Sequence, residues 1–230
     1  MTTISANLQA VNRRIIHACS AAGRDPGTVR LIAVSKTFPA EAVREAHHAG
    51  QQAFGESYVQ EALAKQAQLA DLELEWHFIG PLQSNKTKAV AEHFAWVHSV
   101  DRLKIAERLS AQRPADLPPL NVCVEVNVSG EATKSGCTPE EAPALCHAVA
   151  QLPNLKLRGL MTIPAPAPDS ALVKRQFAQL RSLFERIRRG GLELDTLSMG
   201  MSHDLEEAIQ EGATIVRIGT AIFGERKHTT

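Results

Sequence analysis

Short apolar runs alternate with longer segments of helical period along almost the whole chain. Eight runs have the length and composition of strands: LIAVS (31–35), QQAFGE (51–56), LEWHFIG (74–80), WVHSV (96–100), LNVCVEVNV (120–128), LKLRGLMTI (155–163), LDTLSMG (194–200) and TIVRIG (214–219). Strict alternation of this kind predicts parallel strands joined by right-handed helical crossovers. Eight such units predict an α/β fold that closes into a (β/α)8 TIM barrel.

The length of the chain suits one such barrel. We expect a single domain over residues 1–230, with an extra helix at about 5–22 before a barrel at about 30–226. This helix could cover the gap at the carboxyl end, where TAIFGERKHTT supplies about one or two helical turns. A doubly wound open sheet is the alternative, but TFPAEA, after the first run, lacks the usual glycine-rich turn.

The charge balance argues against two classes of partner. The chain has 25 Lys and Arg against 25 Asp and Glu, so a nucleic acid or an anionic membrane is not expected as the main partner. Lys86 and Lys88 in QSNKTK make only a small basic patch without an aromatic platform. The sequence has neither a signal-peptide core nor a run long enough to span a membrane. The four cysteines lack CxxC or metal-site spacing, which indicates free thiols in the cytoplasm and no metal site.

The first apolar run delivers a lysine at its end. In LIAVSKTFP, alternate residues of a barrel strand point inward, so Ile32 and Val34 face the barrel interior if Lys36 does. Apolar neighbours disfavour the charged ammonium, and the neutral amine can attack an aldehyde to form a Schiff base. A solvated lysine that caps the strand is the alternative interpretation.

The last run places an arginine among apolar residues. In TIVRIGTAIFGER, Arg217 has Gly219 two residues further on and therefore on the same side of the strand. An arginine does not lose its proton in proteins, so a buried one needs an acceptor. Either a protein carboxylate or a ligand can supply that acceptor.

The loops after the seventh and eighth runs have the features of a phosphate site. In SMGMSHD (198–204), Ser202 is a natural helix N-cap, and a glycine-containing helix start can bind an anion. Gly219 and Thr220 offer N–H groups and a hydroxyl in the neighbouring loop, where barrels often bind phosphate. The acidic side chains within residues 204–207 would have to point away, because they repel a phosphate.

An amine, an arginine and a phosphate site together describe an aromatic aldehyde that carries a phosphate, namely pyridoxal phosphate (PLP). The chain also resembles the YggS/PROSC family of pyridoxal phosphate homeostasis proteins over roughly residues 5–226. Seven motifs carry the resemblance, in order: LIAVSKTFP, AFGESYVQEA, WHFIGPLQSNK, VNVSGEATKSG, GLMTIP, LSMGMSHDLEEAI and TIVRIGTAIFG. Agreement of seven separate motifs is far more specific than one short pattern.

The resemblance implies a barrel like the N-terminal domain of alanine racemase and a set of cofactor contacts. Lys36 matches the Schiff-base lysine, Arg217 would face the pyridine nitrogen, and Ser202, Gly219 and Thr220 would hold the phosphate. The sequence departs from the family at one position, Ser57, where asparagine is common. This puts a contact of Ser57 with the cofactor in doubt.

By the same resemblance, the protein buffers and delivers PLP, with apo PLP-dependent enzymes as partners and without established turnover. The alternative is an amino-acid racemase or lyase, with Lys36 as one base and His77 or Cys137 as an acid. Alanine racemase takes its second base, a tyrosine, from another domain. The single tyrosine here, Tyr58, is more simply a packing residue at a helix start. A lone barrel without a dimerising second domain makes a monomer the expected state.

Three further features suit the mouth of a barrel. Glu125 and Asn127 share a strand face with Cys123 and could hydrogen-bond a ligand or each other. Lys134, in SGEATKSG, is either a transient second acceptor for the aldehyde or a mobile surface lysine. The proline-rich stretch TIPAPAPDS (162–170) is either a stiff lid or a spacer before a helix.

Overall fold

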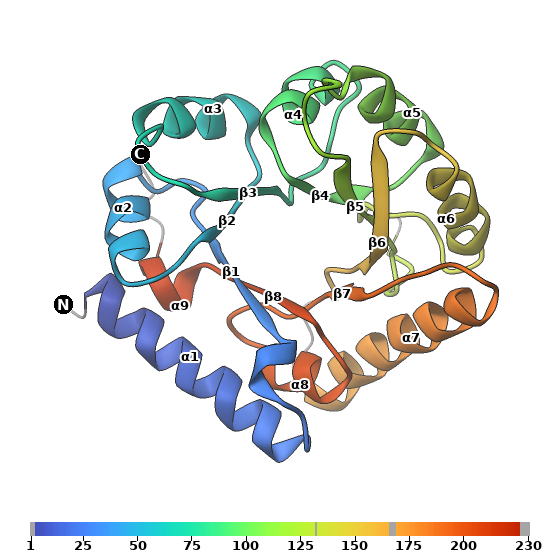
Figure 1. Ribbon diagram of the computed structural model, residues 1–230. Helices are drawn as coiled ribbons and strands as arrows, with labels where there is room; N and C mark the ends of the chain where they lie inside the picture. Colours follow the sequence, from blue (N-terminus) through green and yellow to red (C-terminus); the bar gives the residue numbers. More distant parts are fainter. Residues whose placement is uncertain (1–2, 132, 166–168, 226–230) are drawn as a thin grey trace.

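A computed structural model shows parallel strands that close into a barrel in sequence order (Figure 1). The structure describes residues 3–131, 133–165 and 169–225. The strands are β1 (Arg30–Val34), β2 (Ala53–Glu56), β3 (Glu75–Phe78), β4 (Trp96–Val100), β5 (Leu120–Glu125), β6 (Leu155–Met161), β7 (Thr196–Ser198) and β8 (Ile215–Ile218). β1 pairs with both β2 and β8, so the barrel is closed. The predicted (β/α)8 barrel is confirmed, and the open doubly wound sheet is wrong.

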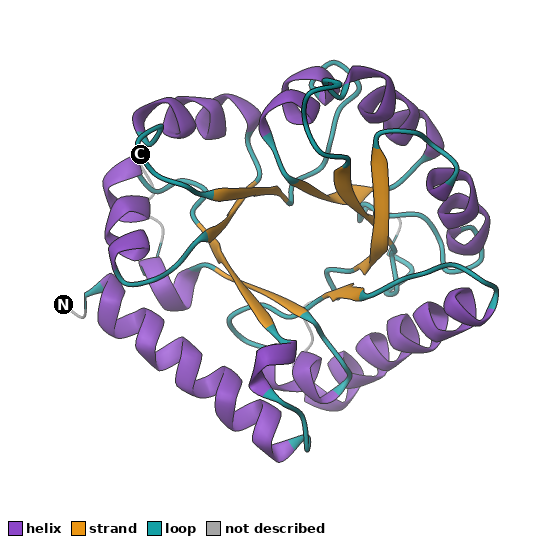
Figure 2. Ribbon diagram, viewed as in Figure 1, coloured by secondary structure: helices purple, strands orange, loops and turns teal. Residues whose placement is uncertain are grey.

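Helices form a ring outside the barrel (Figure 2). They are α1 (Ile4–Ala21), α2 (Ala40–His48), α3 (Val59–Gln68), α4 (Thr87–His93), α5 (Leu103–Gln112), α6 (Ala142–Ala150), α7 (Ser170–Arg189), α8 (Leu205–Gln210) and α9 (Thr220–Phe223), with a 3-10 turn η1 (Pro26–Thr28). Each longer helix turns an apolar stripe inward. In α7, for example, Phe177, Leu180 and Phe184 recur at helical spacing and are buried.

The N-terminal helix α1 lies beside the short helices at the other end of the chain, as Figure 1 shows. Asn7 on α1 donates a hydrogen bond to the carbonyl of Ile222 in α9, 2.8 Å away. Arg14, also on α1, forms an ion pair with Glu206 of α8 at 2.8 Å. α9 has four residues, too few to cover β8 and β1 alone. The extra helix therefore covers the gap that the sequence leaves at this place.

Several predicted strands run past the ends of the observed ones. The run 74–80 contains β3, which ends at Phe78, and the run 120–128 contains β5, which ends at Glu125. Ile79 and Val128 lie beyond these ends and are still buried. Apolar residues that pack over the barrel mouth have the same composition as strand residues, so composition alone does not separate the two.

Two apolar layers fill the molecule, one between barrel and helices and one inside the barrel. The inner layer consists of Ile32, Ala53, Trp96, Cys123, Met161 and Ile215. The interior also holds buried polar side chains, among them His77, His98, Ser198 and Arg217. Buried polar groups require hydrogen-bond partners, so the barrel interior must contain a connected polar network.

The described ranges contain neither a candidate membrane span nor a candidate metal site. No helix there is both long and apolar enough to cross a bilayer. No group of three or more His, Cys, Asp and Glu side chains there could hold a metal ion. The four cysteines are free and buried.

Candidate functional site

One pocket at the carboxyl ends of the strands brings together all five residues singled out by the sequence. It has a volume of about 180 Å³. Its lining comprises Lys36, Ser202, Arg217, Gly219 and Thr220, together with Val34, Phe38, Ile79, Ile163, Met201 and His203. Sites for drug-sized ligands usually have volumes of about 300 to 1,000 Å³, so this pocket suits a small molecule.

Lys36 lies in the turn that follows β1. The strand ends at Val34, and the N–H of Phe38 donates to the carbonyl of Ser35 across the turn at 3.0 Å. Ile32 belongs to the inner apolar layer and Val34 lines the pocket. Lys36 is half-buried above them, at the barrel mouth rather than on the outer surface.

A buried polar network lies beneath this turn. The Ser35 hydroxyl donates to Glu56 Oε1 at 2.6 Å. Lys65 Nζ reaches the same Oε1 at 2.6 Å, the Ser35 carbonyl at 2.7 Å and Glu61 Oε1 at 2.7 Å. Glu61 Oε1 in turn accepts the N–H of Thr37 at 2.5 Å. We call Ser35, Glu56, Glu61 and Lys65 the turn network, because together they fasten both sides of the turn.

The turn network holds a backbone conformation that is otherwise unfavourable. Thr37 has φ of +70°, in the left-handed region that β-branched residues rarely adopt. Burial raises the pKa of Glu56, and the nearby ammonium of Lys65 opposes that shift. Lys65 is only 4% exposed. In the sequence, Lys65 is one of several charged residues on a predicted helical segment, and no pattern distinguishes it as buried.

Arg217 lines the pocket and has neutral partners. Its side chain donates to Ser198 Oγ at 2.6 Å and to the carbonyl of Thr162 at 2.9 Å, and it is 3% exposed. Within the described residues it forms no ion pair, so no protein carboxylate binds it directly. Burial lowers the pKa of Arg217 to about 10, against the attraction of Glu125. The guanidinium has more N–H donors than these two acceptors engage, so it can bind an acceptor inside the pocket.

Ser202 joins the loops after β7 and β8. Its hydroxyl oxygen accepts the N–H of Ala221 at 3.4 Å, and its carbonyl accepts a hydrogen bond from Arg14 at 3.1 Å. The expectation that Ser202 is a helix N-cap is wrong, because α8 begins only at Leu205. A turn intervenes, in which Asp204 Oδ1 accepts the N–H of Met201 at 2.6 Å.

Gly219 lies where β8 approaches β1. A Cβ at this position would lie 3.3 Å from the carbonyl oxygen of Val34, so a larger residue would crowd the strand that leads to Lys36. The acidic residues within 204–207 do not line the pocket. Glu206 pairs with Arg14 and Asp204 binds Met201, so neither carboxylate lines the pocket.

The acid candidates for an enzyme lie outside the pocket lining. His77 is fully buried in the barrel interior, where it contacts Glu75 and His98. Cys137 packs in the outer apolar layer, and burial raises the pKa of its thiol to about 12. Tyr58 is 53% exposed at the start of α3 and does not line the pocket.

The other residues expected at the mouth have local roles. Asn127 accepts hydrogen bonds from Ser129 and Gly130 and so closes its own loop. Lys134 Nζ lies 3.5 Å from the carbonyl of Ile163, beside the pocket rather than in its lining. Ser57 is also outside the lining. Of the proline-rich loop 162–170, residues 166–168 lie outside the described ranges.

The sequence interpretation missed most of the apolar wall and one imidazole. The missed residues are Phe38, Ile79, Ile163, Met201 and His203. Each lies a few positions after the end of a strand. In a barrel these loops meet on one face, so this position relative to the strand was the available signal.

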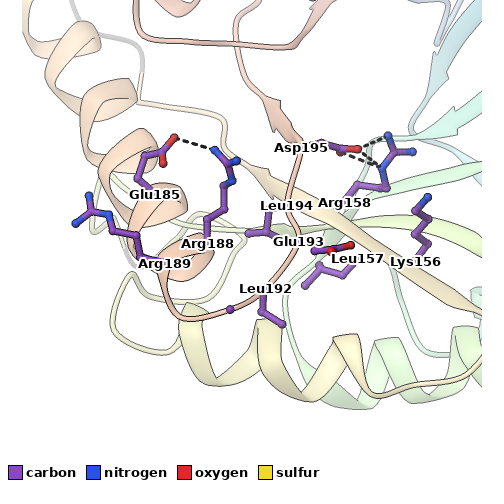
Figure 3. A pocket seen from close by; sticks show the side chains of 11 residues that line it. Lys156, Leu157, Arg158, Glu185, Arg188, Arg189, Leu192, Glu193, Leu194 and Asp195 are labelled. Atoms are coloured by element: carbon purple, nitrogen blue, oxygen red, sulfur yellow. Dashed lines mark hydrogen bonds and ion pairs between the residues drawn. The ribbon is translucent and has the colours of Figure 1, made fainter.

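A second cavity of about 560 Å³ lies between the start of β6, the end of α7 and the segment before β7 (Figure 3). Arg158 in its wall pairs with Asp195 at 2.7 Å, and Arg188 pairs with Glu185 at 3.5 Å. Four of its charged side chains thus pair with one another, while Lys156, Arg189 and Glu193 also line it. None of the residues predicted to bind the cofactor lines this cavity, so we place the candidate site at the smaller pocket.

Known proteins match this chain almost end to end. The model of the alanine racemase N-terminal domain matches residues 6–227. A pyridoxal phosphate homeostasis protein of Pseudomonas aeruginosa is 67% identical over 228 residues, 99% of this chain and 98% of that one. The protein of that name from Escherichia coli is 52% identical over 235 residues, 100% of this chain and 99% of that one. The chain belongs to the pyridoxal phosphate homeostasis protein family.

Solved structures agree with membership of this family. PipY of Synechococcus elongatus, in a structure with PLP bound, is 42% identical with a TM-score of 0.81, over 91% of this chain and 100% of that one. A protein of Bifidobacterium adolescentis is 37% identical with a TM-score of 0.88, over 96% of this chain and 94% of that one. Alanine racemase of Corynebacterium glutamicum is 20% identical with a TM-score of 0.69, and the match covers 96% of this chain and 62% of that one. At this identity the likeness shows the fold alone.

Proposed function

We propose that this protein binds PLP as a Schiff base on Lys36 and serves to buffer the cofactor and deliver it to apo PLP-dependent enzymes. One observation carries the proposal: one small pocket is lined by a lysine, by a buried arginine that has no carboxylate partner among the described residues, and by two strand-end loops with polar groups. A donor-rich lining of this kind fits an anionic aromatic aldehyde. The PLP-bound structure of PipY, a family member, supports the choice of ligand.

The covalent step needs only the lysine and the aldehyde. The Lys36 ammonium first loses a proton to solvent, and the neutral nitrogen attacks the aldehyde carbon. A carbon–nitrogen double bond replaces the carbonyl bond, and the oxygen leaves as water with the two hydrogens of the amine. The reverse reaction with water releases the aldehyde, which suits a protein that must give the cofactor up again.

Arg217 favours storage over catalysis. A guanidinium that faces the pyridine nitrogen disfavours protonation of that nitrogen, because two positive charges would lie a hydrogen bond apart. The ring then withdraws fewer electrons from a bound amino acid. A racemase or lyase would also need an acid in the pocket, and His77 and Cys137 do not line it. Within the described lining, His203 is the side chain left to test for that role.

Reductive trapping tests the site. Purified protein is mixed with PLP, reduced with borohydride and digested, and the modified lysine is identified by peptide mass. We expect the label on Lys36 and its loss in Lys36→Ala, with Lys134→Ala as a matched control that keeps it. Labelling of surface lysines with Lys36 unmodified would overturn the proposal.

A second experiment separates carrier from enzyme. PLP-loaded protein is mixed with an apo PLP-dependent enzyme, and the return of that enzyme's activity is timed against free PLP at the same concentration. Transfer faster than release into solution followed by rebinding supports delivery. Racemised or cleaved product from added amino acids, lost in His203→Gln, would instead favour an enzyme.

A further inference from the structure

A continuous line of polar side chains crosses the barrel interior. Glu75 Oε1 lies 2.6 Å from His77 Nε2, and His77 Nδ1 lies 2.9 Å from His98 Nε2. His98 Nδ1 lies 2.7 Å from Ser198 Oγ, which accepts a hydrogen bond from Arg217 at 2.6 Å. We call these five residues the interior chain. It joins four strands, β3, β4, β7 and β8, and ends at the candidate pocket.

The two ends of the interior chain differ in exposure. His77, His98 and Ser198 are fully buried. Glu75 is the first residue of β3, at the opposite end of the barrel from the pocket, and its side chain is 32% exposed. Arg30, the first residue of β1, pairs with it at 2.8 Å. The interior chain therefore connects a solvent-accessible ion pair to the arginine of the pocket.

Both ends prescribe where the hydrogens lie. Arg217 can only donate, so the oxygen of Ser198 must accept from it. Burial raises the pKa of Glu75, but the hydrogen bond from His77 and the charge of Arg30 oppose this and hold the pKa below its ordinary value. Glu75 is thus a carboxylate that only accepts, and His77 Nε2 must carry a hydrogen.

The middle of the chain follows from its ends if both imidazoles are neutral. Burial lowers the pKa of His77. Burial, together with the charges of Arg217 and Arg30, lowers the pKa of His98 well below its ordinary value. A neutral His77 then accepts at Nδ1 from the Nε2 hydrogen of His98. His98 Nδ1 in turn accepts from the hydroxyl of Ser198. The position of each hydrogen along the interior chain is thereby fixed, and each hydrogen bond is donated in the direction from Arg217 towards Glu75.

The aromatic and charged groups next to the imidazoles do not alter this order of hydrogen bonds. Trp96 of β4 stacks on His77 with ring centroids 5.4 Å apart, and the guanidinium of Arg158 lies 4.7 Å above the Trp96 ring. Glu125 of β5 acts on Arg217 through its charge. The imidazoles also fill space in the barrel, so a test must separate their packing from their hydrogen-bond direction.

We propose that Glu75, His77, His98 and Ser198 are positioning residues for Arg217. By committing the Ser198 proton to His98, they keep the Ser198 oxygen available as an acceptor and hold the guanidinium where it meets the ring nitrogen of bound PLP. This inference rests on the proposed function for its ligand. Its distinctive consequence is that a carboxylate at the far end of the barrel influences the pocket.

The first test examines the interior chain without any ligand. In protein labelled with ¹⁵N-histidine, long-range NMR correlations distinguish protonated from unprotonated ring nitrogens. We expect His77 and His98 to be neutral with hydrogen on Nε2 between pH 6 and 8. Hydrogen on Nδ1 of either ring, or a protonated ring in this range, would overturn the inference whether or not PLP binds.

The second test uses matched variants at the distant end. Glu75→Gln keeps an oxygen that accepts from His77, whereas Glu75→Leu removes it. We expect Glu75→Leu and Ser198→Ala each to weaken PLP binding about tenfold. Glu75→Leu should also shift the pH profile of the absorbance of bound PLP. Glu75→Gln should bind PLP about as tightly as the wild type. Asp71→Leu is the control, because it breaks an ion pair, with Arg44, that is not part of the interior chain.

The two proposals fail in different ways. If wild-type Lys36 is not labelled by PLP, the proposed function is wrong, and the histidine tautomers still decide the order of the chain. If Lys36 is labelled but Glu75→Leu and Ser198→Ala bind PLP as the wild type does, Arg217 needs no positioning and the inference is wrong. A loss shared equally by Asp71→Leu would show general destabilisation and would also overturn it.

Discussion

At the scale of single residues, the loop after β7 depends on a glycine. Gly200 has φ of +99°, and its carbonyl accepts the N–H of Arg217 at 2.9 Å. A Cβ there would lie 2.6 Å from the Cβ of Ala208 and 3.2 Å from Val216. Both the backbone angle and the space therefore require a residue without a side chain.

We predict that Gly200→Ala lowers the free energy of unfolding by about 3 kcal/mol or more, from backbone strain and steric overlap together. Gly191 provides the control, since it has φ of +102° and no atom within 4 Å of the place a Cβ would occupy. Gly191→Ala should show only the backbone part, about 1 kcal/mol. Denaturant unfolding measures both, and equal losses would contradict the steric explanation.

Single residues also show what sequence patterns leave out. Lys36 and Arg217 stand out because each interrupts or ends an apolar run. His77 and His98 are 21 residues apart and Ser198 is 100 residues beyond His98, so their contacts depend on barrel closure. The sequence interpretation named His77 as a candidate acid. Its contact with His98 becomes visible only once the strands are placed around the barrel.

At the scale of elements, the turn network ties β1, β2 and α3 together under the turn that carries Lys36. Ser35 follows β1, Glu56 ends β2, and Glu61 and Lys65 belong to α3. A buried charge that loses its partner is strongly destabilising. Lys65 therefore stabilises the connection between these elements by neutralising Glu56.

We predict that Lys65→Met lowers the free energy of unfolding by about 3 kcal/mol, because the buried carboxylate of Glu56 loses its ammonium partner. Adding Glu56→Gln should restore part of the loss. Lys88→Met is the control, since Lys88 pairs with Glu92 at 3.8 Å on the surface with a side chain 72% exposed. That pair should contribute less than about 1 kcal/mol. A similar effect at both lysines would refute the role given to the turn network.

Element identity was predictable, and element ends were not. Each apolar run overlaps one observed strand, because a parallel barrel buries both faces of its strands and leaves a dense apolar signal. The same signal continues into Ile79 and Val128, which pack beyond the strand ends. Ser202 was misjudged as a helix cap for a related reason. The turn that delays α8 is made by Asp204, and such local bonds compete with helix formation.

At the scale of the whole molecule, buried ionisable groups make stability depend on pH. Burial and then the charge of Asp101 raise the pKa of Glu125 to about 7, against the attraction of Arg217. The folded state keeps this proton between about pH 4.5 and 7, where the unfolded chain releases it. The contribution of Glu125 to stability therefore decreases as the pH rises through this window.

We predict that Glu125→Gln removes the loss of stability that the titration of Glu125 causes as the pH rises. Relative to wild type, the variant should gain up to about 3 kcal/mol in free energy of unfolding between pH 4.5 and 8. Unfolding by denaturant at a series of pH values provides the measurement. Wild-type and variant curves that stay parallel over the whole range would show that Glu125 titrates in the same way in both states.

The closure of β1 on β8 has a consequence for synthesis of the protein. Lys36 comes from the first barrel unit, whereas Arg217, Gly219 and Thr220 come from the last. A nascent chain emerges from the ribosome amino end first, so the lysine is exposed long before its neighbours exist. Contacts between residues so far apart in the sequence also slow folding. An incomplete chain therefore exposes Lys36 without the residues of the last unit, and only the finished barrel completes the lining of the pocket.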